Sequence, residues 1–150
     1  MVLLSVVLTA FSAKKDPDDT GEVITELKGY TLRDNIVSLE DYNLWVITTE
    51  GVFDEKFVAA DETAKRPDFA RQLVVAGKVQ TFANSYNLIF KKMELRNNTL
   101  EVYFTVRKVR RGHSAVPVAM SVIPKDQSVK KVNFYHDYLL VNSTPVNNVY

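Results

Sequence analysis

Residues 86–107 read YNLIFKKMELRNNTLEVYFTVR and carry the clearest hairpin signal in the sequence. An apolar residue occupies every second position from Leu100 to Val106, as it does in a strand that buries one face. The asparagine pair at 97–98 tolerates the positive φ that a tight hairpin turn needs. In the strand before the turn, the apolar parity changes at the lysine pair 91–92, which predicts a β-bulge there.

Strand-like runs of β-branched and apolar residues recur outward from this hairpin in both directions. They cover residues 22–32 with an interruption at Gly29, and residues 35–39, 43–48, 72–79, 116–122 and 132–141. The uninterrupted apolar run at 73–76 predicts a central strand that is covered on both faces. Pro117 places the run 116–122 at an edge or at a bulge, because proline cannot donate a ladder hydrogen bond.

One helix is expected over residues 50–60. Thr48 or Thr49 supplies the cap, and apolar residues recur at three- and four-residue spacing from Val52 to Ala60. The fold class is therefore mainly β, a β-rich α+β protein with about seven or eight strands in an antiparallel sandwich or curled sheet. The short helix near residues 50–60 is its only predicted helical element.

Composition describes one ordinary globular domain over residues 22–150. The whole chain has 150 residues, is 46% hydrophobic and carries a net charge of +1. Such a charge supplies no field for nucleic acid or an anionic membrane, and no nucleic-acid partner is expected. The absence of cysteine removes disulfides, thiolate metal sites and cysteine nucleophiles.

The N-terminus predicts export to the periplasm or cell envelope of a bacterium. Residues 1–13 are almost wholly apolar and resemble a signal peptide, and residues 14–21 form a polar linker. Residues 7–10 also resemble the segment before the lipidated cysteine of a bacterial lipoprotein, but Phe11 stands where that cysteine belongs. Any membrane association is expected through this segment alone. The alternative is that it forms a buried β-strand.

No catalytic, metal or cofactor site is predicted. The only histidines, His113 and His136, lack the spacing of metal ligands, and no serine lies in a nucleophile elbow. We expect His136 to be partly buried and hydrogen-bonded, and His113 to be solvated. A calcium-loop-like start at Asp16 fails at its twelfth position, Leu27, where a bidentate glutamate is required.

Two segments are candidates for binding a protein partner. The first lies at residues 82–86. The second is the densest basic cluster, which suits an acidic partner through bidentate arginine contacts, although a solvated hairpin end is the alternative. The candidate residues are Phe82, Asn84 and Tyr86 in the first segment, and Arg107, Arg110, Arg111 and His113 in the second.

From residue 37 to 141 the order of motifs resembles the C-terminal domain of PrcB, a subunit of a bacterial surface protease complex. The stretches that carry it are 43–47 followed by Phe53 and Phe57, 67–69 running into 73–76, Ser85-Tyr86 through 100–102, and 115–117 through 123–125. Asn84-Ser85 replaces the paired glycines of that family. The resemblance implies a non-catalytic accessory role at the cell surface, assisting or docking a protease, and no cofactor.

The sequence therefore predicts a non-catalytic, exported interaction module that holds a protein partner with a strand edge or with the two candidate segments. One alternative is a protease inhibitor that plugs an active site with those loops. Another is a small-ligand carrier, which the eight Phe, seven Tyr and single Trp suggest, although such aromatics usually form the core. An enzyme is not expected.

Overall fold

The computed structural model describes residues 25–34, 41–79, 86–109, 118–125 and 128–146, which form ten strands and one helix. The mainly β fold with one short helix is confirmed. The strands are β1 (Thr25–Glu26), β2 (Tyr30–Leu32), β3 (Tyr42–Ile47), β4 (Phe57–Ala59), β5 (Gln72–Val79), β6 (Tyr86–Arg96), β7 (Thr99–Lys108), β8 (Ala119–Pro124), β9 (Lys131–His136) and β10 (Leu139–Pro145), and the helix is α1 (Glu50–Lys56).

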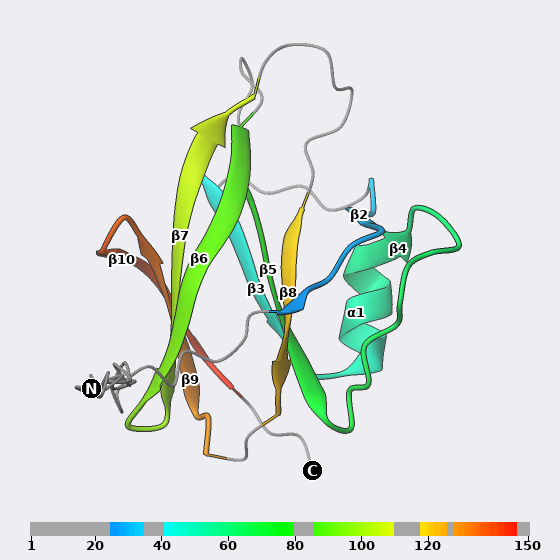
Figure 1. Cartoon of the computed structure of the whole chain (residues 1–150). Coiled ribbons are helices and arrows are strands. Elements are labelled where there is room, and N and C mark those ends of the chain that lie inside the picture. Colours follow the sequence, from blue (N-terminus) through cyan, green and yellow to red (C-terminus); the bar gives the residue numbers. More distant parts are fainter. Residues whose placement is uncertain (1–24, 35–40, 80–85, 110–117, 126–127, 147–150) are drawn as a thin grey trace, which may run out of the picture.

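The elements form three layers (Figure 1). The middle layer is the central sheet, with strand order β1-β8-β5-β3. One of its faces packs against the outer sheet, with order β10-β9-β7-β6, and the other packs against α1 and the pair β2–β4. The arrangement is a sandwich of two sheets with a small helical layer added to one side.

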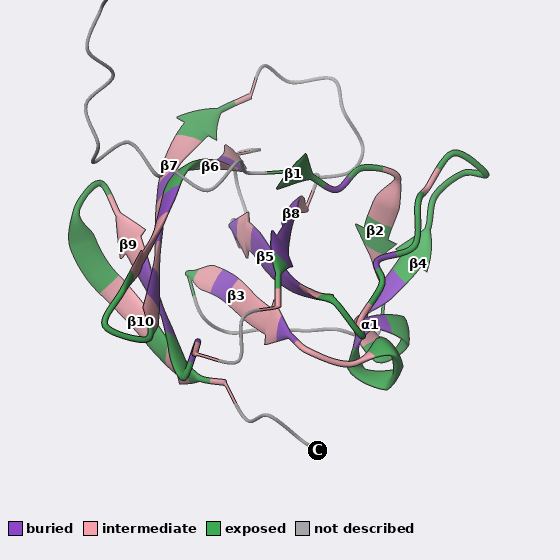
Figure 2. Cartoon of the chain, turned by 60° about the horizontal axis from the view of Figure 1, so that its bottom comes forward, coloured by how far each residue is buried: buried purple, intermediate pink, exposed green. Residues whose placement is uncertain are grey.

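Strand β5 lies between β3 and β8 and is buried on both faces, as its apolar run predicts. Leu73 and Val75 point into the core shared with the outer sheet. Val74 and Ala76 point into a second core under α1. Figure 2 shows this burial along β5 and β8. Because all four side chains are at most 1% exposed, β5 connects the two cores of the molecule.

The predicted hairpin is β6–β7. Its register runs from Tyr86 opposite Lys108 to Arg96 opposite Thr99, and the turn residues Asn97 and Asn98 have φ of 47° and 63°. The register shifts between Phe90 and Lys92, so the predicted bulge is confirmed at the lysine pair.

One strand pair departs from the antiparallel rule. Strands β7 and β9 run parallel, with Thr99 opposite Lys131 and Phe104 opposite His136. Between them the chain crosses to the central sheet to form β8 and then returns, so β9 enters the outer sheet from the end at which β7 begins. All other pairings in the described sheets are antiparallel.

The prediction of one long strand over residues 132–141 is wrong. The chain turns back at Asp137 and Tyr138, with φ of 45° and 75°, and forms the hairpin β9–β10. Aspartate tolerates such a turn, but tyrosine is rare at positive φ, which is why the sequence signals this turn only weakly.

The predicted helix 50–60 is correct at its start and too long at its end. Thr49 caps α1, its hydroxyl accepting a hydrogen bond from the Val52 amide, but the helix ends at Lys56. Phe57 begins β4 and pairs with Leu32 of β2. The three- and four-residue spacing of apolar residues continues past Lys56 because Phe53 of α1 and Phe57 of β4 are buried in the same core.

Gly29 interrupts the first run as expected, separating β1 from β2 at a φ of 85°. Its carbonyl accepts a hydrogen bond from the Ala60 amide at 2.7 Å, and an added Cβ would lie 2.9 Å from Ala64 Cβ. The expectations for residues 1–13, 14–21 and 35–39 lie outside the described residues, as does Pro117 itself. The prediction that the run containing Pro117 forms an edge or bulged strand is wrong for the part that is described. Strand β8 lies between β1 and β5 and pairs with both without a register shift. No helix in the described ranges has the length and hydropathy needed to cross a bilayer.

Candidate functional site

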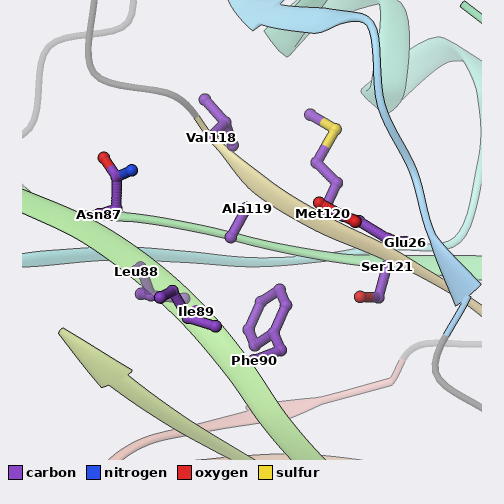
Figure 3. Close-up of a pocket in the computed structure, with 9 residues that line it drawn as sticks. All are labelled: Glu26, Asn87, Leu88, Ile89, Phe90, Val118, Ala119, Met120 and Ser121. Atoms are coloured by element: carbon purple, nitrogen blue, oxygen red, sulfur yellow. The ribbon is translucent and has the colours of Figure 1, made fainter. Parts of the chain in front are cut away.

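A cleft opens between the two sheets where β6 passes β8, and we call it the β6–β8 cleft. Its volume is about 460 Å³. Figure 3 shows Ala119 and Ser121 pointing from β8 toward β6, and the Phe90 ring pointing back toward β8. The lining residues are Glu26, Asn87, Leu88, Ile89, Phe90, Val118, Ala119, Met120 and Ser121.

Small side chains account for the space in this cleft. Ala119 and Ser121 present little volume to the outer sheet, and Gly77 of β5 lies beside Ala119. Leu88 fills the position above Gly77, where an added Cβ would lie 2.9 Å from a Leu88 methyl. Leu88 is therefore buried in the core, whereas the space beside Ala119 and Ser121 forms the cleft, with Ala119 half-buried at its wall and Ser121 only 2% exposed.

Asn87 contributes an unusual polar group to the cleft wall. Its side-chain oxygen Oδ1 is buried and has no hydrogen-bond partner. A buried acceptor without a partner costs roughly 1–3 kcal/mol, a cost that a hydrogen bond accepted on binding would offset.

Beside the cleft, β6 forms the edge of the outer sheet. Within the described residues it pairs with β7 along one edge, and no strand pairs with its other edge. A long edge strand of this kind is a template for pairing with another chain, although the bulge and Lys91 and Lys92 restrict that pairing at its middle. The free stretch next to the cleft is residues 87–90.

The predicted binding residues that the structure describes lie next to this cleft. Tyr86 is opposite Lys108, and Arg107 is opposite Asn87, so the described residues of the two predicted segments lie at one end of the β6–β7 hairpin. Tyr86 packs partly against the core, whereas Arg107 is exposed. The other candidates, Phe82, Asn84, Arg110, Arg111 and His113, lie outside the described residues.

The sequence reasoning missed the residues that form the cleft itself. Asn87 and Ser121 are polar residues inside apolar strand runs, and that pattern was the available signal. It shows that a polar group sits against the core, but it does not show that the two strands border one cleft.

The expectation for His136 is confirmed. A hydrogen bond of 2.8 Å joins its Nδ1 to Tyr42 Oη, and its ring stacks on Phe104 at 5.3 Å. Its Nε2 lies 3.3 Å from Asp137 Oδ2, which favours a ring proton on Nε2 and makes the Tyr42 hydroxyl the donor. Because Tyr42 belongs to the central sheet and His136 to the outer sheet, this bond links the two sheets.

The described residues hold no group of three or more His, Cys, Asp or Glu side chains that could bind a metal ion.

Tyr103 lies on the exposed face of the outer sheet and carries a strongly shifted hydroxyl. Partial burial, together with the hydrogen bond that it donates to Glu101 at 2.8 Å, raises its pKa from 10.0 to about 12. The fold thus favours the neutral phenol, and the stability this contributes is fully present below pH 10 and is lost as the pH rises through about 12.

We expect Tyr103 to be among the last tyrosines to ionise. Absorbance of tyrosinate, followed at pH values where the circular dichroism spectrum is unchanged, should show a late step near pH 12. Tyr103→Phe should remove that step and leave the earlier ones. A single ionisation of all tyrosines near pH 10 in the folded protein would contradict the assignment.

Comparison with family models, with curated proteins and with solved structures finds no match for this chain. The resemblance to the PrcB C-terminal domain remains a prediction from the sequence.

Proposed function

We propose that the chain is a non-catalytic binding module that holds an extended segment of a protein partner along β6, with partner side chains in the β6–β8 cleft. The observation that carries the proposal is the position of the cleft, which opens beside the edge of β6 that has no partner strand among the described residues. Strand addition to such an edge supplies affinity through backbone hydrogen bonds, and adjacent pockets supply specificity.

The chemistry of the cleft suits alternate apolar side chains of an added strand. Its walls come largely from apolar residues such as Phe90 and Ala119, and burial of apolar area there favours binding. The buried Asn87 oxygen accepts a hydrogen bond from a partner N–H, which offsets its present cost. Specificity for an extended segment follows from the apolar space that receives alternate side chains of the added strand.

The two predicted segments extend this surface. Tyr86 and Arg107 lie at the end of the hairpin next to Asn87, so a strand added to β6 leads toward them. Arg107 is exposed and available for a carboxylate of the partner.

The location and partner class that we propose rest on the sequence. The apolar segment at residues 1–13 supports export to the bacterial envelope, and the resemblance to PrcB supports a protease as the partner. The proposal includes no cofactor and no chemical step.

We expect the substitution Ala119→Phe to abolish partner binding, because the aromatic ring fills the space that receives the partner side chain. The full chain, immobilised and incubated with bacterial envelope extract, should retain a stoichiometric partner that the variant loses. Amide hydrogen exchange of the partner complex should slow at residues 87–90 of β6. Unchanged circular dichroism of the variant would show that its fold is intact.

The matched control is Val52→Phe, which adds the same ring at an exposed position on α1, outside the cleft lining. This variant should bind the partner as the unmodified chain does. The proposal is wrong if no stoichiometric partner is retained, or if Ala119→Phe and Val52→Phe retain the partner equally.

A further inference from the structure

The β9–β10 turn presents Tyr138 in an unusual way. Tyr138 is 88% exposed, and its backbone has a φ of 75°. A bulky residue at positive φ costs free energy that glycine at the same position avoids. A strained backbone that carries an exposed aromatic ring indicates that the ring itself has a use.

A shallow pocket of about 300 Å³ lies beside this turn, and we call it the Tyr138 pocket. Tyr103 and Tyr138 border it with ring centroids 6.1 Å apart and planes inclined at 54°. Behind them Tyr135 stacks on Tyr103 at 4.9 Å. The lining residues are Lys91, Lys92, Glu94, Arg96, Tyr103, Phe104, Asp137 and Tyr138.

Three of the five charged side chains that line the pocket are paired with one another. Glu94 forms ion pairs with Lys92 and with Arg96, and Arg96 also lies 3.7 Å from Glu101. The hydrogen bond from Lys92 holds the pKa of Glu94 below its usual range, so that side chain remains a carboxylate and an acceptor. A polyanion gains little from Lys92 and Arg96, which already have carboxylate partners.

A neutral ligand that carries both donors and acceptors matches this arrangement better. Carboxylates accept from hydroxyl groups, and ammonium and guanidinium groups donate to them. The exposed face of the Tyr138 ring is the negative side of an aromatic quadrupole, which attracts the slightly positive C–H bonds of a flat aliphatic ring. A volume of 300 Å³ is at the lower limit of ligand pockets.

We propose that the Tyr138 pocket binds a sugar ring of a neutral oligosaccharide, with Tyr138 stacked on the C–H face of the ring. Glu94, Asp137 and Lys92 hydrogen-bond to its hydroxyl groups. This site lies on the exposed face of the outer sheet, its lining residues are separate from those of the β6–β8 cleft apart from the shared strand β6, and it does not depend on the proposed partner.

The test is an NMR titration of the ¹⁵N-labelled full chain with the neutral probe cellotetraose. Amide shifts should change at Asp137, Tyr138 and Lys92 with a Kd of about 1 mM, typical of a weak single-ring site. Tyr138→Ala should weaken binding at least about tenfold, which is the loss of about 1.4 kcal/mol.

The matched control is Leu139→Ala. Leu139 is the next residue and is 71% exposed, but it does not line the pocket. This variant should bind cellotetraose as the unmodified chain does. Tyr138→Gly should raise the melting temperature by about 2 °C, because it relieves the backbone, and yet lose binding. That opposite effect on stability and binding separates a binding role from a structural one.

Three results would overturn the proposal. The first is no amide shift at these residues up to a probe concentration of about 10 mM, tenfold above the expected Kd. The second is equal loss of binding in Tyr138→Ala and Leu139→Ala. The third is a titration in which a thymidine tetranucleotide shifts the same amides and cellotetraose does not, which would assign the tyrosines to base stacking.

Discussion

Phe53→Ala should lower the free energy of unfolding by about 3–5 kcal/mol, the usual cost of removing a fully buried phenylalanine. Phe53 is 0% exposed and is the only buried residue of α1. Its ring meets Tyr30 at 4.9 Å, and Phe57 and Phe69 at 5.4 Å each. The substitution therefore leaves a cavity where the helix, the β2–β4 pair and the central sheet meet.

Equilibrium unfolding in urea measures this loss, and Trp45 supplies the signal. Its indole packs edge-on against Phe57 at 5.6 Å, so its fluorescence reports on the same core. The control is Val52→Ala on the same helix, where the residue is 39% exposed and the expected change is within about 0.5 kcal/mol. A loss below about 1 kcal/mol for Phe53→Ala would mean that α1 is not held by this ring.

Phe104→Ala should cost a similar amount, about 3–5 kcal/mol, at the interface of the two sheets. Phe104 belongs to β7 and is 1% exposed. It contacts Tyr42 of the central sheet at 5.5 Å and stacks on His136, with the two planes inclined by 5°. Removing this ring deletes packing between the sheets and the support of the Tyr42–His136 hydrogen bond.

Tyr42→Phe separates these two contributions. It keeps the aromatic ring and removes only the hydroxyl that bonds to His136, so the expected loss is about 1 kcal/mol. Both variants are measured by the same urea unfolding curves. If Tyr42→Phe cost as much as Phe104→Ala, the polar link and not the aromatic packing would dominate the contact between the sheets.

Local signals predicted the parts of the fold that depend on neighbouring residues. The Asn97-Asn98 turn, the bulge before Lys92 and the alternation along β7 all depend on residues close in sequence, and each is confirmed. The double burial of β5 was also readable, because an uninterrupted apolar strand has no solvent face.

The remaining features depend on contacts between distant residues. The turn at Asp137 and Tyr138 is marked only weakly, because aspartate tolerates positive φ but tyrosine rarely adopts it. The β6–β8 cleft brings Asn87 together with Ser121, and pattern reading places residues on strands without placing strands side by side. The sequence pattern therefore pointed to Tyr86 and Arg107, which lie at the margin of the β6–β8 cleft, and to none of the residues that form its walls.

The parallel pairing of β7 with β9 affects the order in which the protein can fold. The β6–β7 hairpin is local and can close within microseconds, whereas pairing Thr99 with Lys131 must close the long segment between them, which contains β8 of the other sheet. Along the chain, strands of the central sheet are followed by β6 and β7 of the outer sheet, then by β8 of the central sheet, and then by β9 and β10 of the outer sheet. The two sheets therefore share one continuous chain path, and we infer that they fold and unfold together as one cooperative unit.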